Sequence, residues 1–204
     1  MPNHVTNILR IVGKDSEKVF KKIRGRDEGY IDFNMIVRMP EGLHETRSPA
    51  TGEAEKILQE CNHESNKVVA YLKENIEELL GDHSETIKNL SAFATCGYSN
   101  WYDWTKANWG TKWNAYDQTI NEDGSITFLT AWSTPFPAMA ALSLKYPEVT
   151  VVVEYADEDI GSNCGRYALV NGETIENYKP IGKEADKFAR GVIHSKNNKR
   201  GAKI

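Results

Sequence analysis

The sequence has few cysteines and no long apolar run. Its three cysteines are odd in number and far apart, and none belongs to a Cys-x-x-Cys spacing. This pattern predicts neither a disulfide framework nor a zinc site. The longest strongly apolar run, VTVVV, is far too short to cross a bilayer, so we expect no membrane association. The N-terminal residues show no signal-peptide pattern, so we expect a cytoplasmic protein.

The common signatures of catalysis are also missing. The histidines are scattered without ligand spacing, and there is no GxSxG, Walker or GxGxxG motif. Cys164 lies in GSNCGR, which matches no nucleophile signature and is better explained as a small apolar residue at a strand start. Asp157, Glu158 and Asp159 could bind a cation, although a solvated loop is the favoured interpretation. We therefore expect no enzyme, no cofactor and no metal.

The charge is unevenly distributed along the chain. The net charge is −4, but residues 179–204 carry eight basic and two acidic residues, and the remainder carries 17 basic and 27 acidic ones. An acidic body thus ends in a basic tail. The tail is either a solvated terminus or a contact for nucleic acid or a partner. Its candidate contacts are Lys196, Lys199, Arg200 and Lys203.

Periodicity predicts an α+β protein. Strands are expected at HVTNILRIVG, at 149–156 and at 164–172, and an extended segment at YIDFNMIVRMP. Helices are expected at DSEKVFKKIRG, between 52 and 80, from Ser84 to about Gly110, and from Pro135 to Pro147. Two alternating runs around NEDG (121–124) predict a β-hairpin. One helical face would carry Phe93, Trp101 and Trp104.

Without its inserted helices, this order is β-α-β-β-α-β, the ferredoxin-like split βαβ plan. We therefore predict a ferredoxin-like domain over residues 1–178. It would contain a helical insertion around 41–84 and an extra C-terminal strand. Residues 179–204 would follow as the basic tail.

The stretch NWGTKWNAYD (108–117) is unusually aromatic, and all five tryptophans fall between Trp101 and Trp132. The structural interpretation places the rings in the core and lets the polar residues cap a helix and shape the hairpin. The functional interpretation is a small groove. Its candidate binding residues are Asn108, Trp109, Lys112, Trp113, Asn114, Asp117 and Trp132.

Four blocks carry a family resemblance: MPNHVTN, DFNMIVRMP, NWGTKWNAYD and FLTAWSTPFPAMAALSLKYP. They resemble the YubB ferredoxin-like family, accessory proteins of bacteriophages and conjugative plasmids without an assigned activity. The resemblance spans residues 1–146, and VVVEYADE extends it to about 158. It implies the fold, a mobile-element origin and a bacterial host cytoplasm, and it brings no catalytic residues. The basic tail lies outside it.

Three functional hypotheses follow. The first is an accessory protein that binds a host protein and inhibits a defence or nucleic-acid-processing system, because Trp and Tyr are frequent interface anchors and an acidic body complements basic partners. The second is a single-stranded nucleic-acid binder that uses sheet aromatics and the basic tail. The acidic body opposes it. The third is a small-ligand-binding protein.

Overall fold

The computed structural model describes residues 3–25, 29–80 and 83–197. The chain forms two compact units. The first combines Met1–Arg38 with Asn108–Ile204, and the second is Met39–Ala107. The second unit is therefore an insertion into the first, between residues 38 and 108.

The first unit is built on an antiparallel sheet. Its strands are β1 (His4–Val12), β2 (Tyr116–Ile120), β3 (Ile126–Ala131), β4 (Thr150–Asp157), β5 (Cys164–Val170) and β6 (Glu173–Tyr178). They lie in the order β2-β3-β1-β4-β5-β6. The order β2-β3-β1-β4, with a helix after β1 and another after β3, is the arrangement that the ferredoxin-like plan requires. The predicted α+β ferredoxin-like fold is confirmed.

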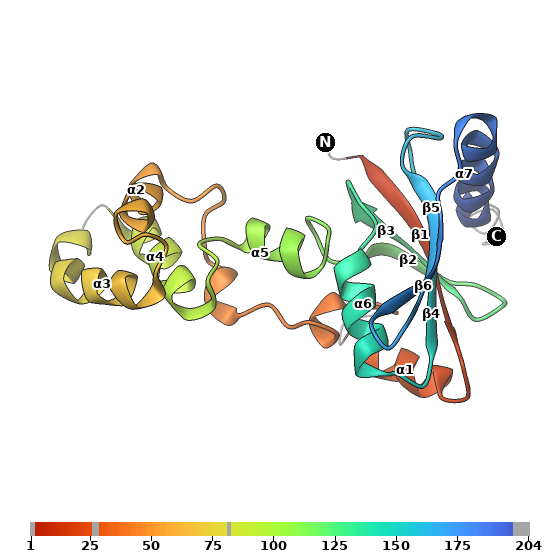
Figure 1. The fold of residues 1–204 in the computed structure, drawn as a ribbon, viewed down its shortest axis with the longest axis horizontal. Coiled ribbons are helices and arrows are strands. Elements are labelled where there is room, and N and C mark those ends of the chain that lie inside the picture. The colour runs from red at the N-terminus through yellow and green to blue at the C-terminus, as the bar shows by residue number, and fades with distance from the viewer. Residues whose placement is uncertain (1–2, 26–28, 81–82, 198–204) are drawn as a thin grey trace, which may run out of the picture. The chain divides into compact units, whose positions relative to one another are not determined.

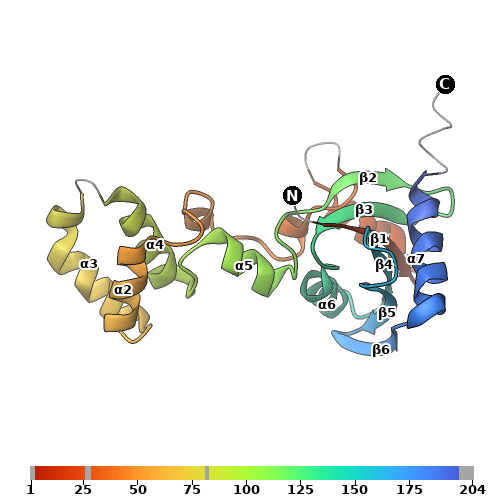
Figure 2. The same ribbon diagram turned by 90° about the horizontal axis from the view of Figure 1, so that it is seen from above.

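Helices cover both faces of this sheet. Helices α1 (Ser16–Ile23) and α6 (Phe136–Lys145) lie on one face and α7 (Gly182–Asn197) on the other, as Figure 1 shows. Figure 2 shows α6 and α7 on opposite sides of the sheet. On the α7 face, Ile8 and Ala156 pack against Ala185 and Ala189 of the helix. Because side chains alternate along a strand, the fully buried Leu9 points to the opposite face. The core therefore has two layers, one on each side of the sheet.

The C-terminal region contains more structure than expected. Two strands, β5 and β6, follow β4, where one was predicted. Asn171 and Gly172 join them with φ values of 51° and 80°, as a tight hairpin turn requires. Helix α7 then occupies much of the predicted tail. Of the predicted tail contacts, Lys196 is in α7, and Lys199, Arg200 and Lys203 lie outside the described residues.

The β2-β3 hairpin forms around the predicted turn, but β2 is shorter than the alternating run suggested. Asn121 N donates to Ser125 O at 2.7 Å and Gly124 N to Asn121 O at 2.9 Å. The alternation from residue 111 is not all strand, because β2 begins only at Tyr116 and its register shifts before Thr119. Asp117 lies in that irregular stretch with φ +49°. The irregularity is a β-bulge, which leaves an extra residue unpaired.

The expected extended segment YIDFNMIVRMP is not a strand. It contains a short 3₁₀ helix, η1 (Phe33–Met35), which Asp32 caps by accepting a hydrogen bond from Asn34 N. Its interior is apolar, with Ile31 and Phe33 both buried. Buried apolar residues in a short run fit a packed loop as well as a strand, so periodicity alone misled the assignment.

The second unit is helical. It contains η2 (Glu41–Leu43), α2 (Gly52–Glu60), α3 (Ser65–Leu79) and α4 (Ser84–Cys96), and α5 (Trp101–Asn108) leads out of it. The expected continuous helix from Ser84 is wrong, because Gly97 ends α4 with a φ of +79°. Phe93 and Trp104 therefore belong to different helices. The core gathers Ala54, Leu58 and Leu90. Within residues 3–25, 29–80 and 83–197, no helix is both long and apolar enough to cross a membrane.

Candidate functional site

Trp109 anchors the segment that carries the candidate residues. It is 3% exposed, its Nε1 donates to Val37 O at 2.9 Å, and its ring packs 5.9 Å from that of Phe33. A buried indole whose N–H is satisfied serves the core. Trp109 is therefore not available to line a groove, which corrects one member of the predicted binding set.

Thr111 continues this anchoring. Its hydroxyl donates to Ala131 O at 2.9 Å and accepts from Ala131 N at 3.1 Å. A single buried side chain thus satisfies both backbone groups of a β3 residue, in place of a neighbouring strand. Thr111 thus holds the segment along the end of β3.

Asn114 also has a structural role. Its Oδ1 accepts from Phe33 N at 2.8 Å and from Ala115 N, and its Nδ2 donates to Asp32 Oδ1 at 2.6 Å. Gln118 acts in the same way, accepting from Tyr30 N and Ile31 N. These amides replace the strand pairing that the loop at residues 30–33 lacks. Asn114 is therefore a clamp on that loop.

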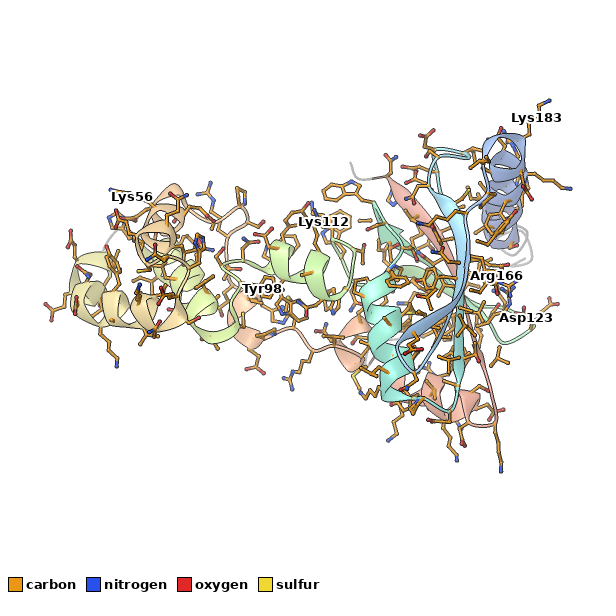
Figure 3. All side chains as sticks on the ribbon, viewed as in Figure 1. Lys56, Tyr98, Lys112, Asp123, Arg166 and Lys183 are labelled. Carbon is orange, nitrogen blue, oxygen red and sulfur yellow. The ribbon has the colours of Figure 1, made fainter. Side chains whose placement is uncertain are left out.

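Trp113 and Trp132 are the two candidate rings that remain at the surface. They are 40% and 43% exposed. The Nζ of Lys112 lies 4.9 Å from the ring centre of Trp113 and 5.0 Å from that of Trp132. Both distances are within cation–π range. We call Lys112, Trp113 and Trp132 the tryptophan clasp; the position of Lys112 is labelled in Figure 3.

The backbone at Trp132 is unusual. Its φ is +71°, a conformation that bulky residues rarely adopt. Three contacts hold it. Its N–H donates to Asn3 O at 2.9 Å, Asn163 Nδ2 donates to its carbonyl at 3.3 Å, and its ring meets Lys112. A strained residue persists where its surroundings over-determine it. Here the strain presents the indole at the surface directly after β3.

Tyr116 and His4 extend the clasp. The Tyr116 ring meets that of Trp113 edge-on at 6.2 Å, and its hydroxyl lies 2.6 Å from His4 Nδ1. Burial, reinforced by the negative charges of Glu158 and Asp117, raises the pKa of Tyr116. The phenol therefore stays protonated at neutral pH. We call the clasp together with Tyr116 and His4 the aromatic surface.

The acidic cluster helps to build this surface. Asp157 is buried and accepts from Asn3 Nδ2 and from Asp159 N, and Glu158 accepts from His4 N at 3.1 Å. These carboxylates tie the start of β1 to the end of β4. Within the described part of the chain, no group of three or more His, Cys, Asp or Glu side chains is placed to hold a metal ion.

Two other predicted features have structural explanations. Cys164 is buried at the first position of β5, and burial raises the pKa of its thiol. That shift is opposite to the one a nucleophilic cysteine needs. The nucleic-acid hypothesis counted Phe128 and Tyr155 among the sheet aromatics on which bases could stack, but both are buried. Asp117 lies in the β2 bulge, and Asn108 is the last residue of α5.

Tyr116 was predicted only as one of the sheet aromatics for base stacking, and His4 was not predicted as a site residue. Tyr116 shares its alternation with Lys112 and Asn114, which was a usable signal. His4 comes from the other end of the chain, 112 positions away, and only the antiparallel pairing of β1 with β3 brings it close. No local pattern carries that information.

The fold and site thus define a ferredoxin-like α+β unit with an aromatic surface. A family model described as a ferredoxin-like domain in Api92-like protein matches residues 108–192. The match runs from the end of α5 to within α7 and includes the tryptophan clasp. No curated protein and no solved structure matches the chain. The comparison supports a ferredoxin-like family, and the finer YubB assignment stays a prediction.

Proposed function

We propose that the protein is a non-enzymatic accessory factor, encoded by a phage or plasmid, that binds a host protein through the aromatic surface. The observation that carries this proposal is the tryptophan clasp, with two half-exposed indoles on either side of one lysine. The mobile-element origin rests on the YubB resemblance. Inhibition of a host defence or nucleic-acid-processing system is the role we propose for the complex.

The exposed rings of the clasp are favourable for a partner to cover. Burying an indole removes a large apolar area from water, and interface hot spots are enriched in tryptophan. The clasp also needs little reorganisation, because Trp132 is held by its backbone and Lys112 is held by both rings. Preorganised side chains lose less conformational entropy on association. A partner that covers the clasp therefore gains the burial energy of the exposed part of both rings, 40% of Trp113 and 43% of Trp132.

Single-stranded nucleic acid is the second candidate. The same geometry favours it, because indoles stack on bases and an adjacent lysine contacts phosphate. The covered sheet faces limit stacking to the clasp, since Phe128 and Tyr155 are buried. Salt dependence separates the candidates: each phosphate contact contributes to a steep fall of affinity with salt.

The deciding experiment is affinity capture from a bacterial lysate, with and without nuclease. The bait is the full chain, and the test variant is the double substitution Trp113→Ser and Trp132→Ser. Both rings are half-exposed, so we expect the variant to fold, which circular dichroism checks. Ile181→Ser is the matched control, because Ile181 is 83% exposed and lies outside the aromatic surface.

We expect a nuclease-resistant, stoichiometric protein that the wild type and the Ile181→Ser control retain and the double variant loses. Nuclease-sensitive capture that depends on the two tryptophans would move nucleic acid to first place. Equal capture by the wild type and the double variant would refute the role of the aromatic surface.

A further inference from the structure

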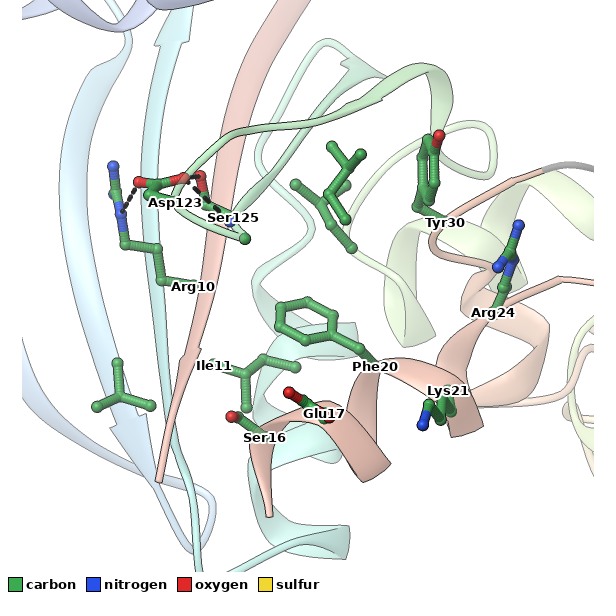
Figure 4. Close-up of a pocket in the computed structure, with 14 residues that line it drawn as sticks. Arg10, Ile11, Ser16, Glu17, Phe20, Lys21, Arg24, Tyr30, Asp123 and Ser125 are labelled. Atoms are coloured by element: carbon green, nitrogen blue, oxygen red, sulfur yellow. Dashed lines mark hydrogen bonds and ion pairs between the residues drawn. The ribbon is translucent and has the colours of Figure 1, made fainter. Parts of the chain in front are cut away.

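A second concave site lies on the first unit, formed by β1, α1, Tyr30 and the tip of the β2-β3 hairpin (Figure 4). Its volume is about 550 Å³. Small-molecule sites in proteins span roughly 300–1,000 Å³. None of the residues that line it belongs to the aromatic surface. We call it the hairpin cavity.

The wall of the hairpin cavity is apolar. Ile11 and Ile126 are buried in the sheet, and Phe20 projects from α1 toward the hairpin, as Figure 4 shows. Val12 and Ile120 also line the cavity, and both are more than half exposed. Apolar area that is left in water is favourable to cover, at about 25 cal/mol per Å². An apolar ligand body would remove this area from water.

At one end of the cavity, the guanidinium of Arg10 is already paired with carboxylates of the protein. Arg10 Nη1 lies 2.6 Å from Glu154 Oε2, and its Nε lies 3.6 Å from Asp123 Oδ2. Asp123 in turn accepts hydrogen bonds from Ser125 N and Oγ, which together lower the pKa of its carboxyl group. One cation is thus paired with two carboxylates, so this end offers an anionic ligand no unpaired positive charge.

The rim near α1 is different. Lys21 is in the last turn of α1, Arg24 is the C-cap residue that follows it, and both line the cavity. Neither is ion-paired to a carboxylate within the described residues. The Arg24 guanidinium lies 5.6 Å from the Tyr30 ring centre, which holds it over the rim. Among the described residues that line this side, Glu17 is the one acid beside two cations, so the lining of the rim carries one net positive charge.

We propose that the hairpin cavity binds a small amphipathic anion, with an aliphatic or aromatic body against Phe20 and Ile120 and a single carboxylate at Lys21 and Arg24. The apolar wall supplies the burial energy. The two cations supply charge-assisted hydrogen bonds, which select an anion over a neutral or cationic analogue. The Arg10 end has no unpaired cation, so it takes the uncharged part of the ligand.

The test uses a fluorescent probe of matching chemistry, 1-anilinonaphthalene-8-sulfonate, which is apolar and anionic. We expect its fluorescence to rise on the wild-type protein and octanoate to displace it. Octanol should compete more weakly and octylammonium least. The order octanoate, octanol, octylammonium is the signature of a site with an apolar wall and a positive rim.

Substitutions locate the site. Lys21→Gln combined with Arg24→Gln should weaken octanoate binding about three- to tenfold, the effect of losing two partly exposed charge contacts. Lys22→Gln is the matched control, because Lys22 is in the same last turn of α1 but does not line the cavity. Ile120→Asp should abolish displaceable fluorescence without unfolding the chain, since Ile120 is at the exposed end of β2.

Several results would overturn the proposal: no fluorescence rise, an unchanged signal in Ile120→Asp, or octylammonium competing as well as octanoate. The inference is independent of the proposed function. The Trp113→Ser and Trp132→Ser variant should keep full octanoate binding, and its failure to do so would place the ligand at the aromatic surface instead.

Discussion

Gly110 is the residue whose substitution should most disturb the scaffold of the aromatic surface. Its φ is +83°, in the left-handed region, where a side chain costs about 1–2 kcal/mol. A Cβ at this position would also lie 2.3 Å from Pro137 Cδ and 3.3 Å from Phe136 N, at the start of α6. Pro137 is a rigid ring, so the backbone has to move, and such overpacking costs about 1–3 kcal/mol more.

We therefore expect Gly110→Ala to lower the free energy of unfolding by about 2–5 kcal/mol. Gly124→Ala is the matched control. Gly124 has a φ of +78°, and a Cβ there would meet no atom within 4 Å. Its substitution should cost only the backbone strain, about 1–2 kcal/mol. The difference between the two variants isolates the contact with Pro137.

The assay is urea unfolding of both variants and the wild type, followed by far-ultraviolet circular dichroism. A change in midpoint at constant slope reports stability. If both variants lost the same stability, the close packing of Gly110 on Pro137 would be disproved.

Three further predictions concern single side chains. Trp109→Phe keeps a buried ring but leaves Val37 O without its indole donor, so unfolding in urea should show a loss of about 1–2 kcal/mol. Ser125→Ala removes a donor that lowers the pKa of Asp123. A depressed carboxyl pKa stabilises the fold above the unfolded value of about 3.9, and the benefit disappears as pH falls through the folded pKa. The stability gap to wild type should therefore be full at pH 7 and shrink below about pH 4, and a gap that did not change with pH would contradict the assignment. Cys164 should react with a thiol reagent more slowly in the native protein than in urea, because burial raises its pKa; equal rates by peptide mapping would contradict its burial.

Much of the fold was predictable because its signals are local. The NEDG turn lies between two alternating runs, so the hairpin follows from turn chemistry and period alone. The run VTVVVEYA is β-branched and continuous, as expected of β4, which is paired on both sides. Once these elements were in order, the ferredoxin-like plan was the topology that fitted the order.

The errors arose where one residue or one distant contact decides the structure. Gly97 interrupts a pattern that otherwise continues as a helix, and its left-handed φ cannot be read from apolar spacing. The segment 30–33 looks like a strand, but Asn114 and Gln118 satisfy its backbone from more than 80 residues away. Side-chain hydrogen bonds between residues so far apart in the sequence produce no periodic pattern in it.

The position of the candidate site was predictable, but the roles of its residues were not, because distant contacts decide them. The sequence located the aromatic stretch but could not sort its rings, because burial depends on what packs from elsewhere. Trp109 meets Phe33 and Val37 and becomes core. Trp113, four positions on, meets Lys112 and Tyr116 and stays at the surface. The same residue type thus has two roles that only the tertiary contacts separate.

The bond from Trp109 to Val37 has a consequence for how this protein could be remodelled. It joins the chain just before the second unit leaves the sheet domain, at residue 38, to the chain just after it returns, at residue 108. The first unit thus holds together the two points at which the insertion begins and ends. This link would allow the insertion to be replaced, because a short turn that joins residues 38 and 108 would preserve the core of the first unit. The ferredoxin-like unit is thus a scaffold into which a different segment could be inserted in place of residues 39–107.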